Sequence, residues 1–348
     1  MKSMKLVGLR RMAATDVPDA VVRNDNDVAI KMARMGICGS DVHYYAEGGI
    51  GSQRVQYPWT VGHEGSGVVV AVGKSVKCVQ VGDRIAFDPA QSCGVCDQCL
   101  EGRSHTCGAQ KFMGCPGQIE GCLSTFVVIP DYACYRIPDE MTLEEAALVE
   151  PLSIAGHSVI LADIKSAATI AVLGAGPIGL SVLLCAKAHG ISHSFVSDKI
   201  DSRLEVAVRS GADWVGNPSK LDLVAEISKI EPKLLDVVFE CTGEQEAIDQ
   251  AVELLKPGGK LMLIGIPGAA NRISFDINKL RRKELCIQNV RRQNNCVGRA
   301  IELIASKQVD VLPLVTHRFS FDDAQDGFEM VADYRDGIVK AMVTFDEA

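Results

Sequence analysis

Short apolar runs alternate with longer amphipathic stretches over residues 152–288. The apolar runs are rich in β-branched residues and are spaced like strands that are separated by helices. This alternation predicts a doubly wound parallel sheet with helices on both faces, which is an α/β fold. A turn at residues 256–259 leads into the last predicted strand. The predicted strands are residues 169–173, 194–197, 214–216, 237–240 and 260–265.

The segments on either side of this region have a different pattern. Residues 1–37 and 68–82 combine short apolar runs with turn residues and glycines, which predicts short, barrel-like strands. Amphipathic helices are expected later in the chain, followed by one more strand. These elements are residues 297–306, 321–334 and 339–345.

The two patterns indicate two domains. We expect residues 1–151 and 289–348 to form a mostly-β domain and residues 152–288 to form the α/β domain. The C-terminal elements are expected to return to the first domain, which would place an active site in the cleft between the domains.

Three glycines directly follow the first predicted strand of the α/β domain. Gly174, Gly176 and Gly179 have the G-x-G-x-x-G spacing of a dinucleotide-binding turn. The first glycine allows the turn, the second lets a pyrophosphate approach the backbone, and the third lets the next helix pack closely. Further cofactor contacts are expected at Pro177, Ile178, Arg203, Thr242, Ile264 and Ile266.

The next predicted strand ends in Asp198, about twenty residues after the glycines. Its carboxylate can accept hydrogen bonds from the ribose hydroxyls of the adenosine, and it would repel a 2′-phosphate. The sequence therefore predicts NAD rather than NADP, although the cations Lys199 and Arg203 nearby could tolerate a phosphate. A plain turn aspartate before a helix is the alternative.

Cys38, His63 and Glu64 are candidate metal ligands in the first domain, and each lies beside glycines. A thiolate, an imidazole and a carboxylate are ligands that a catalytic zinc ion uses when it keeps one position open. Taken singly, a cysteine is more often a core residue and a histidine is more often satisfied by a hydrogen bond.

A second metal site is predicted from four cysteines in the C-x2-C-x2-C-x7-C pattern. Four thiolates close a tetrahedron around zinc and leave no position for a substrate, so this site would be structural. An iron–sulfur cluster is the main competitor, and the short lobe and the lack of a following proline disfavour it. The four residues are Cys93, Cys96, Cys99 and Cys107.

Net charge and cysteine content limit the binding partners and the cellular location that we expect. A formal charge of −8 argues against a nucleic-acid partner or an anionic membrane surface. Thirteen cysteines without a secretory signal favour metal binding over disulfides and a cytoplasmic location. Residues 166–186 carry no charge and are long enough to suggest a membrane span, but their glycines and proline favour a buried strand and helix.

Together these motifs resemble those of the zinc-dependent medium-chain alcohol dehydrogenases, and within them the sorbitol (L-iditol) and xylitol dehydrogenases. The resemblance covers nearly the whole chain and implies a Rossmann domain beside a GroES-like catalytic domain, one catalytic and one structural zinc ion per chain, and a homo-oligomer, a tetramer. It implies that Glu150 is either a fourth zinc ligand or bonded to the zinc-bound water. The matching segments are residues 38–44, 62–64, 93–107, 150–153, 174–179 and 290–292.

The resemblance also implies a reaction, the NAD-dependent oxidation of a polyol to a ketose. Zinc would act as a Lewis acid on the substrate hydroxyl, and the alkoxide would pass hydride to the nicotinamide. Ser40 and His43 resemble a proton relay. Tyr44 and Arg291 resemble contacts to the substrate hydroxyls.

Other functions stay open on the sequence. A phosphorylated polyol, threonine or a diol could be the substrate of a related enzyme, and Arg291 could bind a phosphate. A non-catalytic nucleotide-binding protein, with zinc only holding the fold, is a different class. The open ligand set beside Ser40 and His43 argues against that class, because a purely structural site does not need it.

Overall fold

The computed structural model describes residues 1–267 and 272–345, which form two compact units. The first unit consists of Met1–Glu150, Val297–Ser306 and the described residues from Val315 onward. The second unit consists of the described residues of Pro151–Cys296 together with Lys307–Leu314.

The second boundary differs from the expected one at residue 289. Strand β17 (Cys286–Asn289) ends there, but the N–H of Val290 still donates to the carbonyl of Leu263 (3.0 Å), and the chain belongs to the second unit as far as Cys296. Lys307–Leu314 also belongs to the second unit, because helix η3 (Leu312–Leu314) packs against α6 (Asp201–Arg209).

The first unit is built on a sheet with the strand order β11-β7-β6-β3-β19-β18, and β10 also pairs with β3. Its neighbours are antiparallel except for β18 and β19, which are parallel. The strands of this sheet are β3 (Asp27–Gly36), β6 (Glu64–Val72), β7 (Arg84–Phe87), β10 (Phe126–Pro130), β11 (Cys134–Arg136), β18 (Val315–Ser320) and β19 (Lys340–Thr344).

Shorter elements surround this sheet. The strand pairs are β1 (Lys2–Gly8) with β2 (Arg11–Asp16), β4 (Gly49–Ile50) with β5 (Gln53–Arg54), and β8 (Ala90–Gln91) with β9 (Lys111–Phe112). The helices are α1 (Gly39–Glu47), α2 (Asp97–Leu100), α3 (Leu143–Ala147), the start of α4 (Val149–Ala162), α10 (Val297–Ala305), α11 (Ala324–Ala332), and the short 3-10 turns η1 (Ser104–Thr106), η2 (Asp131–Ala133) and η4 (Arg335–Gly337).

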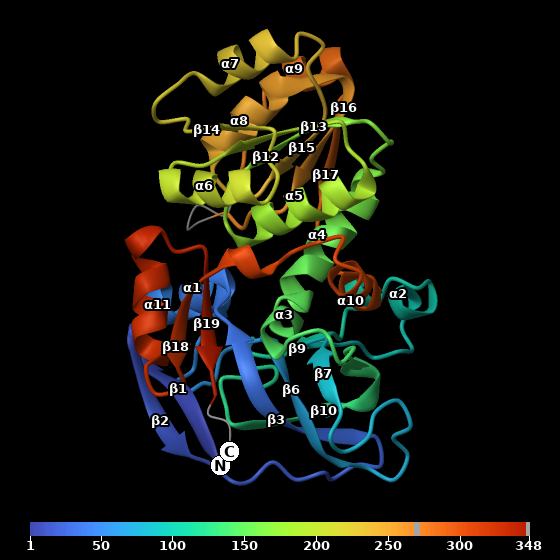
Figure 1. The fold of residues 1–348 in the computed structure, drawn as a ribbon, viewed down its shortest axis with the longest axis vertical. Coiled ribbons are helices and arrows are strands. Elements are labelled where there is room, and N and C mark those ends of the chain that lie inside the picture. Colours follow the sequence, from blue (N-terminus) through green and yellow to red (C-terminus); the bar gives the residue numbers. More distant parts are fainter. Residues whose placement is uncertain (268–271, 346–348) are drawn as a thin grey trace. The chain divides into compact units, whose positions relative to one another are not determined.

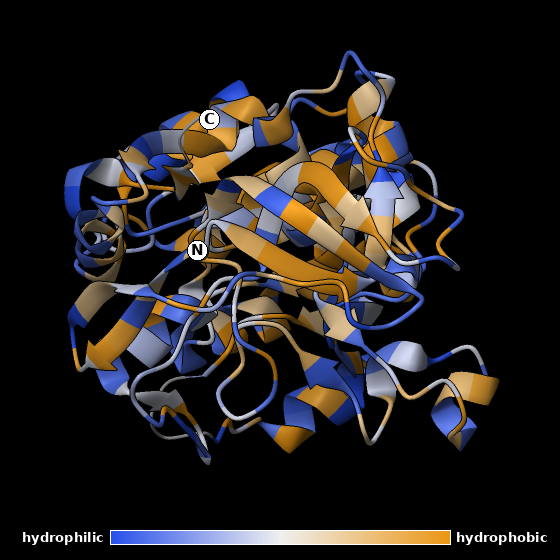
Figure 2. Ribbon diagram, turned by 90° about the horizontal axis from the view of Figure 1, so that it is seen from below, coloured by the Kyte–Doolittle hydropathy of each residue, from blue (hydrophilic) through white to orange (hydrophobic). Residues whose placement is uncertain are grey.

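The core of the first unit lies between its sheet and the helices packed on it. Ile30 of β3, Ile85 and Phe87 of β7, Tyr45 of α1 and Phe328 of α11 are all fully buried there. Figure 2 shows hydrophobic residues concentrated on the central strands. Burial of this apolar surface is the main favourable term for folding the unit.

The second unit is a parallel sheet with the strand order β14-β13-β12-β15-β16-β17. Helices α5 and α6 cover one face, and α7, α8 and α9 cover the other (Figure 1). The predicted doubly wound α/β fold is confirmed. The elements are β12 (Thr169–Leu173), α5 (Pro177–His189), β13 (His193–Ser197), α6, β14 (Trp214–Gly216), α7 (Leu223–Ile230), β15 (Leu235–Glu240), α8 (Gln245–Leu254), β16 (Leu255–Leu263), α9 (Ile277–Lys283) and β17.

The strand order reverses between β12 and β15. In open α/β sheets, ligands bind at the carboxyl ends of the strands at such a reversal. Leu173, the last residue of β12, is in register with Glu240, the last residue of β15. The glycine turn that follows Leu173 therefore lies at this binding edge.

Two features of this sheet differ from the sequence-based expectation. The turn expected at residues 256–259 lies inside β16, where Gly258 takes a φ of +76° and the pairing with β15 shifts in register after Leu235. Strand β17 was not predicted, because its four residues are only partly buried and carry no clear apolar alternation.

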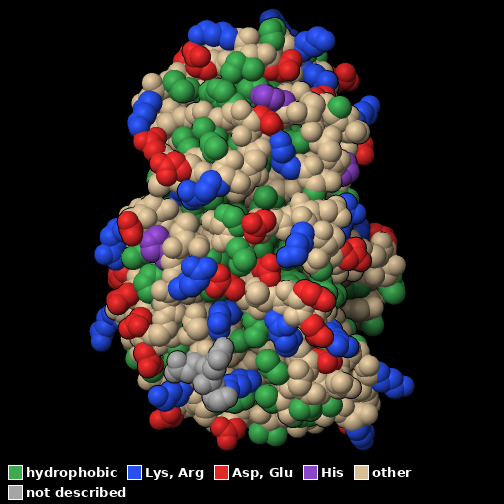
Figure 3. All heavy atoms as spheres, viewed as in Figure 1, with side chains coloured by type: hydrophobic (Ala, Val, Ile, Leu, Met, Phe, Trp, Pro, Cys, Tyr) green, Lys and Arg blue, Asp and Glu red, His purple; other side chains and the backbone are tan. Residues whose placement is uncertain are grey.

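The surface carries charges of both signs, and the helices were also compared with the requirements for a membrane span. Positive and negative side chains are interspersed on the face in view in Figure 3. Among the described residues, no helix combines the length and the apolar character needed to cross a bilayer.

Asp236, near the start of β15, links strands at the amino edge of the parallel sheet. Its Oδ2 accepts a hydrogen bond from the N–H of Thr169 (2.8 Å), and its Oδ1 pairs with the ammonium of Lys256. Burial raises the pKa of Asp236, but the bonds from Lys256 and Thr169 outweigh burial, and the net shift is downward. The ionised carboxylate therefore stabilises the fold.

We expect Asp236→Asn to lower the free energy of unfolding by about 1–2 kcal/mol at pH 7, as for a partly exposed charge-assisted hydrogen bond. Because the folded pKa is lowered, this stabilisation is fully present above the unfolded pKa and is lost as the pH falls through the folded pKa. The difference between the two proteins should stay constant from pH 7 to about pH 5 and shrink below about pH 4. Thermal unfolding midpoints of both proteins across this range measure it, and a constant difference down to the lowest pH would contradict the ionic role.

Candidate active site

The candidate catalytic centre begins at the N-terminus of α1. Cys38 is the N-cap residue of this helix, and its backbone N–H donates to Oδ2 of Asp41 (3.4 Å). The hydroxyl of Ser40 lies 3.3 Å from the sulfur of Cys38, so the predicted relay hydroxyl stands beside the predicted ligand.

His63 is held by a buried carboxylate that the sequence reasoning did not single out. Its Nδ1 lies 3.3 Å from Oδ1 of Asp41, and this oxygen also accepts from the N–H of Gly62 (3.1 Å). An Nδ1–carboxylate contact orients the imidazole and leaves Nε2 for a metal. Burial lowers the pKa of His63, but Asp41 and Cys38 outweigh burial and raise it well above its usual value. The site therefore attracts positive charge.

Glu64, the first residue of β6, is paired with a lysine from the far end of the sequence. Lys340, the first residue of β19, donates to Oε1 and Oε2 of Glu64 at 2.8 and 2.5 Å and to the carbonyl of Ile37 at 3.1 Å. Both side chains are 1% exposed. Burial lowers the pKa of Lys340, but Glu64 and Cys38 raise it overall, so the ammonium stays charged.

Cys38, His63 and Glu64 form one cluster. Their ligand atoms all lie within 4.8 Å of one another. Such a sulfur, nitrogen and oxygen set can hold a zinc ion with room for a further ligand. The contact with Lys340 means that Glu64 shares its carboxylate between this ammonium and any bound metal.

Glu150 lies outside that three-residue cluster but belongs to its electrostatic surroundings. It is buried near the start of α4. Burial raises the pKa of Glu150 to about 8, His63 and Lys340 act to lower it, and Glu64 acts to raise it. A nearby divalent cation would favour its ionised form.

The predicted relay residue His43 and the predicted substrate contacts Tyr44 and Arg291 differ in their exposure and in their contacts. Nδ1 of His43 lies 2.8 Å from Oε1 of Glu47, one turn further along the helix, and about a third of the His43 side chain is exposed. The hydroxyl of Tyr44 is buried and lies 3.5 Å from both the sulfur of Cys115 and Oε1 of Gln53. Arg291, the other predicted substrate contact, is an exposed residue of the second unit.

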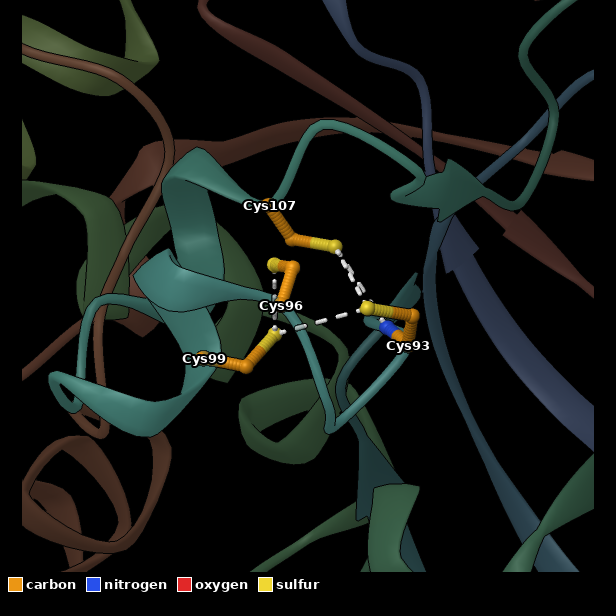
Figure 4. Close-up of side chains that lie close together, drawn as sticks. All are labelled: Cys93, Cys96, Cys99 and Cys107. Atoms are coloured by element: carbon orange, nitrogen blue, oxygen red, sulfur yellow. Dashed lines mark hydrogen bonds between the residues drawn. The ribbon is translucent and has the colours of Figure 1, made fainter.

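The four predicted structural ligands, Cys93, Cys96, Cys99 and Cys107, lie around α2 and η1 with their sulfurs turned toward one another (Figure 4). Three sulfur–sulfur distances are 3.5, 3.6 and 4.0 Å. Zn–S bonds of about 2.3 Å in a tetrahedron give sulfur–sulfur edges of about 3.8 Å. The spacing therefore fits a tetrahedral zinc site and is far too long for disulfides.

The thiol environment of this lobe also fits a metal. Backbone N–H groups of Val95 and Cys96 lower the pKa of Cys93 to about 6. Burial raises the pKa of Cys99 to about 11, so this thiol needs a cation to lose its proton near neutral pH.

The glycine turn of the second unit has the geometry that its spacing predicts. Gly174 takes a φ of +102°, which L side chains rarely adopt. A Cβ on Gly179 would lie 1.8 Å from the carbonyl oxygen of Gly174, so no side chain fits there. Gly176 caps α5, and Pro177 and Ile178 form its first turn. The N–H groups at this helix start are available to an anion.

Asp198 lies against this turn. Its Oδ2 accepts from the N–H of Ala175 and its Oδ1 from the N–H of Ile200, both at 2.8 Å. The neighbouring cation Lys199 is directed to Glu246, with 3.0 Å between Nζ and Oε2. Arg203 is buried, and its Nη1 lies 3.9 Å from the position that a Cβ on Gly176 would take.

The remaining predicted cofactor contacts follow the next two strands. Thr242 is exposed just after β15, and its hydroxyl donates to Oε1 of Glu240 (2.5 Å). Ile264 and Ile266 follow β16, and Ile266 is largely exposed. These residues therefore lie at the carboxyl edge of the sheet, where a dinucleotide binds in this fold.

Comparison with known proteins bears on these sites. Residues 24–139 match the alcohol dehydrogenase GroES-like domain, and residues 177–306 match the zinc-binding dehydrogenase domain. The sorbitol dehydrogenase of Bacillus subtilis is 36% identical over 94% of this chain and 92% of its own length. The chain belongs to the zinc-dependent medium-chain alcohol dehydrogenases.

Other relatives agree with this assignment. The D-xylulose reductase of Saccharomyces cerevisiae is 34% identical over 96% of this chain and 94% of its own length. A crystal structure of an Escherichia coli oxidoreductase of unknown specificity superposes with a TM-score of 0.94 at 33% identity and covers 99% of both chains. The predicted family, the GroES-like and Rossmann fold class and the enzyme class are confirmed. The cofactors of this dehydrogenase are zinc and a nicotinamide dinucleotide.

Asp41 and Lys340 are the site residues that sequence reasoning missed. Asp41 stands three residues after the N-cap of α1, which is the position of a capping-box carboxylate, so its sequence position gave a usable signal. Lys340 stands in the apolar run Val-Lys-Ala-Met-Val, where one charged residue amid buried neighbours indicates a buried partner.

We expect two zinc ions per chain in the purified protein. Cys38→Ser should leave one, since the four-cysteine lobe is intact, and Cys99→Ser should also leave one, since the other cluster is intact. Metal analysis by mass spectrometry, with protein concentration measured independently, gives the ratios. A single zinc ion in the wild-type protein would remove one of the two assignments, the catalytic cluster or the cysteine lobe, and two zinc ions in Cys38→Ser would remove the catalytic cluster from the metal sites.

Proposed function

We propose that this dehydrogenase oxidises a secondary hydroxyl of a polyol to a ketone and uses NAD as the hydride acceptor. The observation that carries the proposal is the clustering of Cys38, His63 and Glu64 with the Ser40 hydroxyl beside them. Zinc held by this set would supply Lewis acidity that lowers the pKa of an alcohol.

The donor set supports a polyol in particular. A carboxylate in place of a second thiolate makes the metal harder and more oxygen-seeking, which suits a substrate with neighbouring hydroxyls. The curated relatives named above are a sorbitol dehydrogenase and a D-xylulose reductase, and both names denote action on polyols or the related ketoses.

The chain supplies a route for the hydroxyl proton. Ser40 would accept the proton of the substrate hydroxyl, and His43 would pass it to solvent. His43 fits this role because it lies on the same helix as Ser40, is partly exposed and contacts Glu47. Glu150 would be either a fourth ligand or a partner of a water molecule at the metal.

The choice of NAD rests on Asp198. Two backbone N–H groups fix its carboxylate beside the glycine turn, and the adjacent cation, Lys199, is paired with Glu246. A fixed negative charge at this position disfavours a 2′-phosphate.

A substrate panel tests the proposal. Sorbitol, xylitol, galactitol, iditol and their phosphates, together with threonine and butanediol, are offered with NAD while reduced-cofactor absorbance is recorded. We expect turnover with at least one free polyol and none in Cys38→Ser, which should still bind NADH. Turnover restricted to a phosphorylated polyol, threonine or a diol would contradict the polyol assignment, and an active Cys38→Ser would contradict the role of the cluster.

We expect Asp198→Ala to weaken NADH binding about ten-fold or more, as for the loss of hydrogen bonds to both ribose hydroxyls, and to weaken NADPH binding much less. Damage to the turn itself would affect both dinucleotides alike, so the ratio of the two dissociation constants isolates the ribose contact. Fluorescence titration measures both constants. An unchanged ratio would show that Asp198 does not select the cofactor.

A further inference from the structure

Glu240 is a buried carboxylate at the binding edge of the parallel sheet. It ends β15 and is 1% exposed. Its backbone is in register with Leu173 of β12 on one side and Leu263 of β16 on the other. The glycine turn follows Leu173, and the loop with Ile264 follows Leu263. Glu240 therefore stands between the two segments at the reversal of strand order.

The carboxylate binds the turn that leaves its own strand. Oε1 accepts from the N–H of Thr242 (2.6 Å), the hydroxyl of Thr242 (2.5 Å) and the N–H of Gly243 (2.9 Å). A buried carboxylate is costly unless such donors satisfy it. These three donors come from two consecutive residues, so the position of the side chain and the conformation of this turn depend on each other.

The turn of residues 241–243 has no free space on either side. A Cβ on Gly174 would lie 2.8 Å from Cγ2 of Thr242, so the threonine methyl packs on the first glycine of the fingerprint. A Cβ on Gly243 would lie 2.3 Å from the carbonyl oxygen of Ile266. A Cβ on Gly265 would lie 2.1 Å from the nitrogen of Gly243 and 2.7 Å from Oε2 of Glu240. A shift of this turn would therefore displace both neighbouring segments.

We propose that Glu240 is a positioning residue for the dinucleotide, because it fixes the turn that spaces the glycine fingerprint from the loop of residues 264–266. Glu240 is covered by protein and acts through Thr242 and Gly243. The proposal rests on the dinucleotide site of the proposed function and assigns a distinct role to a residue that lines neither the metal nor the ribose.

A purely structural role makes a different prediction. If Glu240 only stabilises the sheet, its loss lowers the unfolding temperature and leaves the affinity of the folded protein for NADH unchanged. Asp236 supplies the matched control, since it binds the backbone N–H of Thr169 near the opposite end of the same strand. Asp236→Asn should lower stability without changing NADH affinity.

The experiment measures NADH dissociation constants by fluorescence and unfolding temperatures without dinucleotide for the zinc-loaded wild type, Glu240→Ala, Glu240→Asp and Asp236→Asn. We expect Glu240→Ala to weaken NADH binding about ten-fold or more, because small misplacements of binding groups have effects of this size. Glu240→Asp keeps the charge but withdraws the acceptor by one methylene, and should weaken binding at least about three-fold.

The outcomes separate the hypotheses. NADH affinity equal to wild type in Glu240→Ala overturns the positioning role, whatever the unfolding temperature. If Glu240→Ala does not fold, Glu240→Asp decides in the same way. A weakening of the same size in Asp236→Asn also overturns it, because any damage to β15 would then suffice. A wild-type protein that binds no NADH contradicts the proposed function. This result is distinct from the outcomes above, which compare variants with a wild type that does bind NADH.

Discussion

The pairing of buried charge around His63 is the constraint on which the candidate catalytic centre depends. Asp41, Glu64 and Lys340 are nearly or fully inaccessible to solvent, and removing such groups from water is costly unless each finds a partner. Asp41 is bound by the N–H of Gly62 and by His63, and Glu64 is bound by the ammonium of Lys340. Asp41 and Cys38 raise the pKa of His63 against the effect of burial, so the centre favours positive charge.

The need to pair these buried charges also explains why a glycine stands at position 36. Gly36 stands where β3 passes Glu64, and a Cβ at Gly36 would lie 2.2 Å from Oε2 of that residue. The missing side chain lets the carboxylate turn toward Lys340. Phe112 packs on the ring of His63 with centroids 5.1 Å apart and limits access of water to the pair. Apolar packing and charge pairing therefore define one geometry for the ligands.

Most of the second unit could be predicted because its signals are local. The β-branched run of β12, the glycines after it and Asp198 lie within thirty residues of one another, and each reports a backbone requirement of the fold. Strand β17 and the domain boundary beyond it could not be predicted, because a half-exposed strand of four residues has no periodicity. The turn expected before β16 is instead a register shift, which depends on pairing with β15.

The sequence pointed to the three residues that cluster in the candidate site, but it gave little indication of the partners of these residues. Cys38, His63 and Glu64 stand beside glycines in short motifs, but Lys340 is 276 residues from Glu64, and only the fold shows that they meet. Glu240 looked like the end of a strand, and its three donors became visible only with the turn in place. Long-range electrostatic partners leave little trace in one sequence, since any charged residue in an apolar run is a candidate.

The position of β19 has a consequence for synthesis on the ribosome. The strand pairs with residues 34–36 of β3 and brings Lys340 to Glu64, so the sheet of the first unit lacks this pairing until residues 340–344 have been translated. Pro151–Cys296, the main segment of the second unit, is complete well before that point. Strand β3 is therefore translated long before its partner β19, and the nascent chain carries an unpaired strand edge at residues 34–36 until β19 arrives.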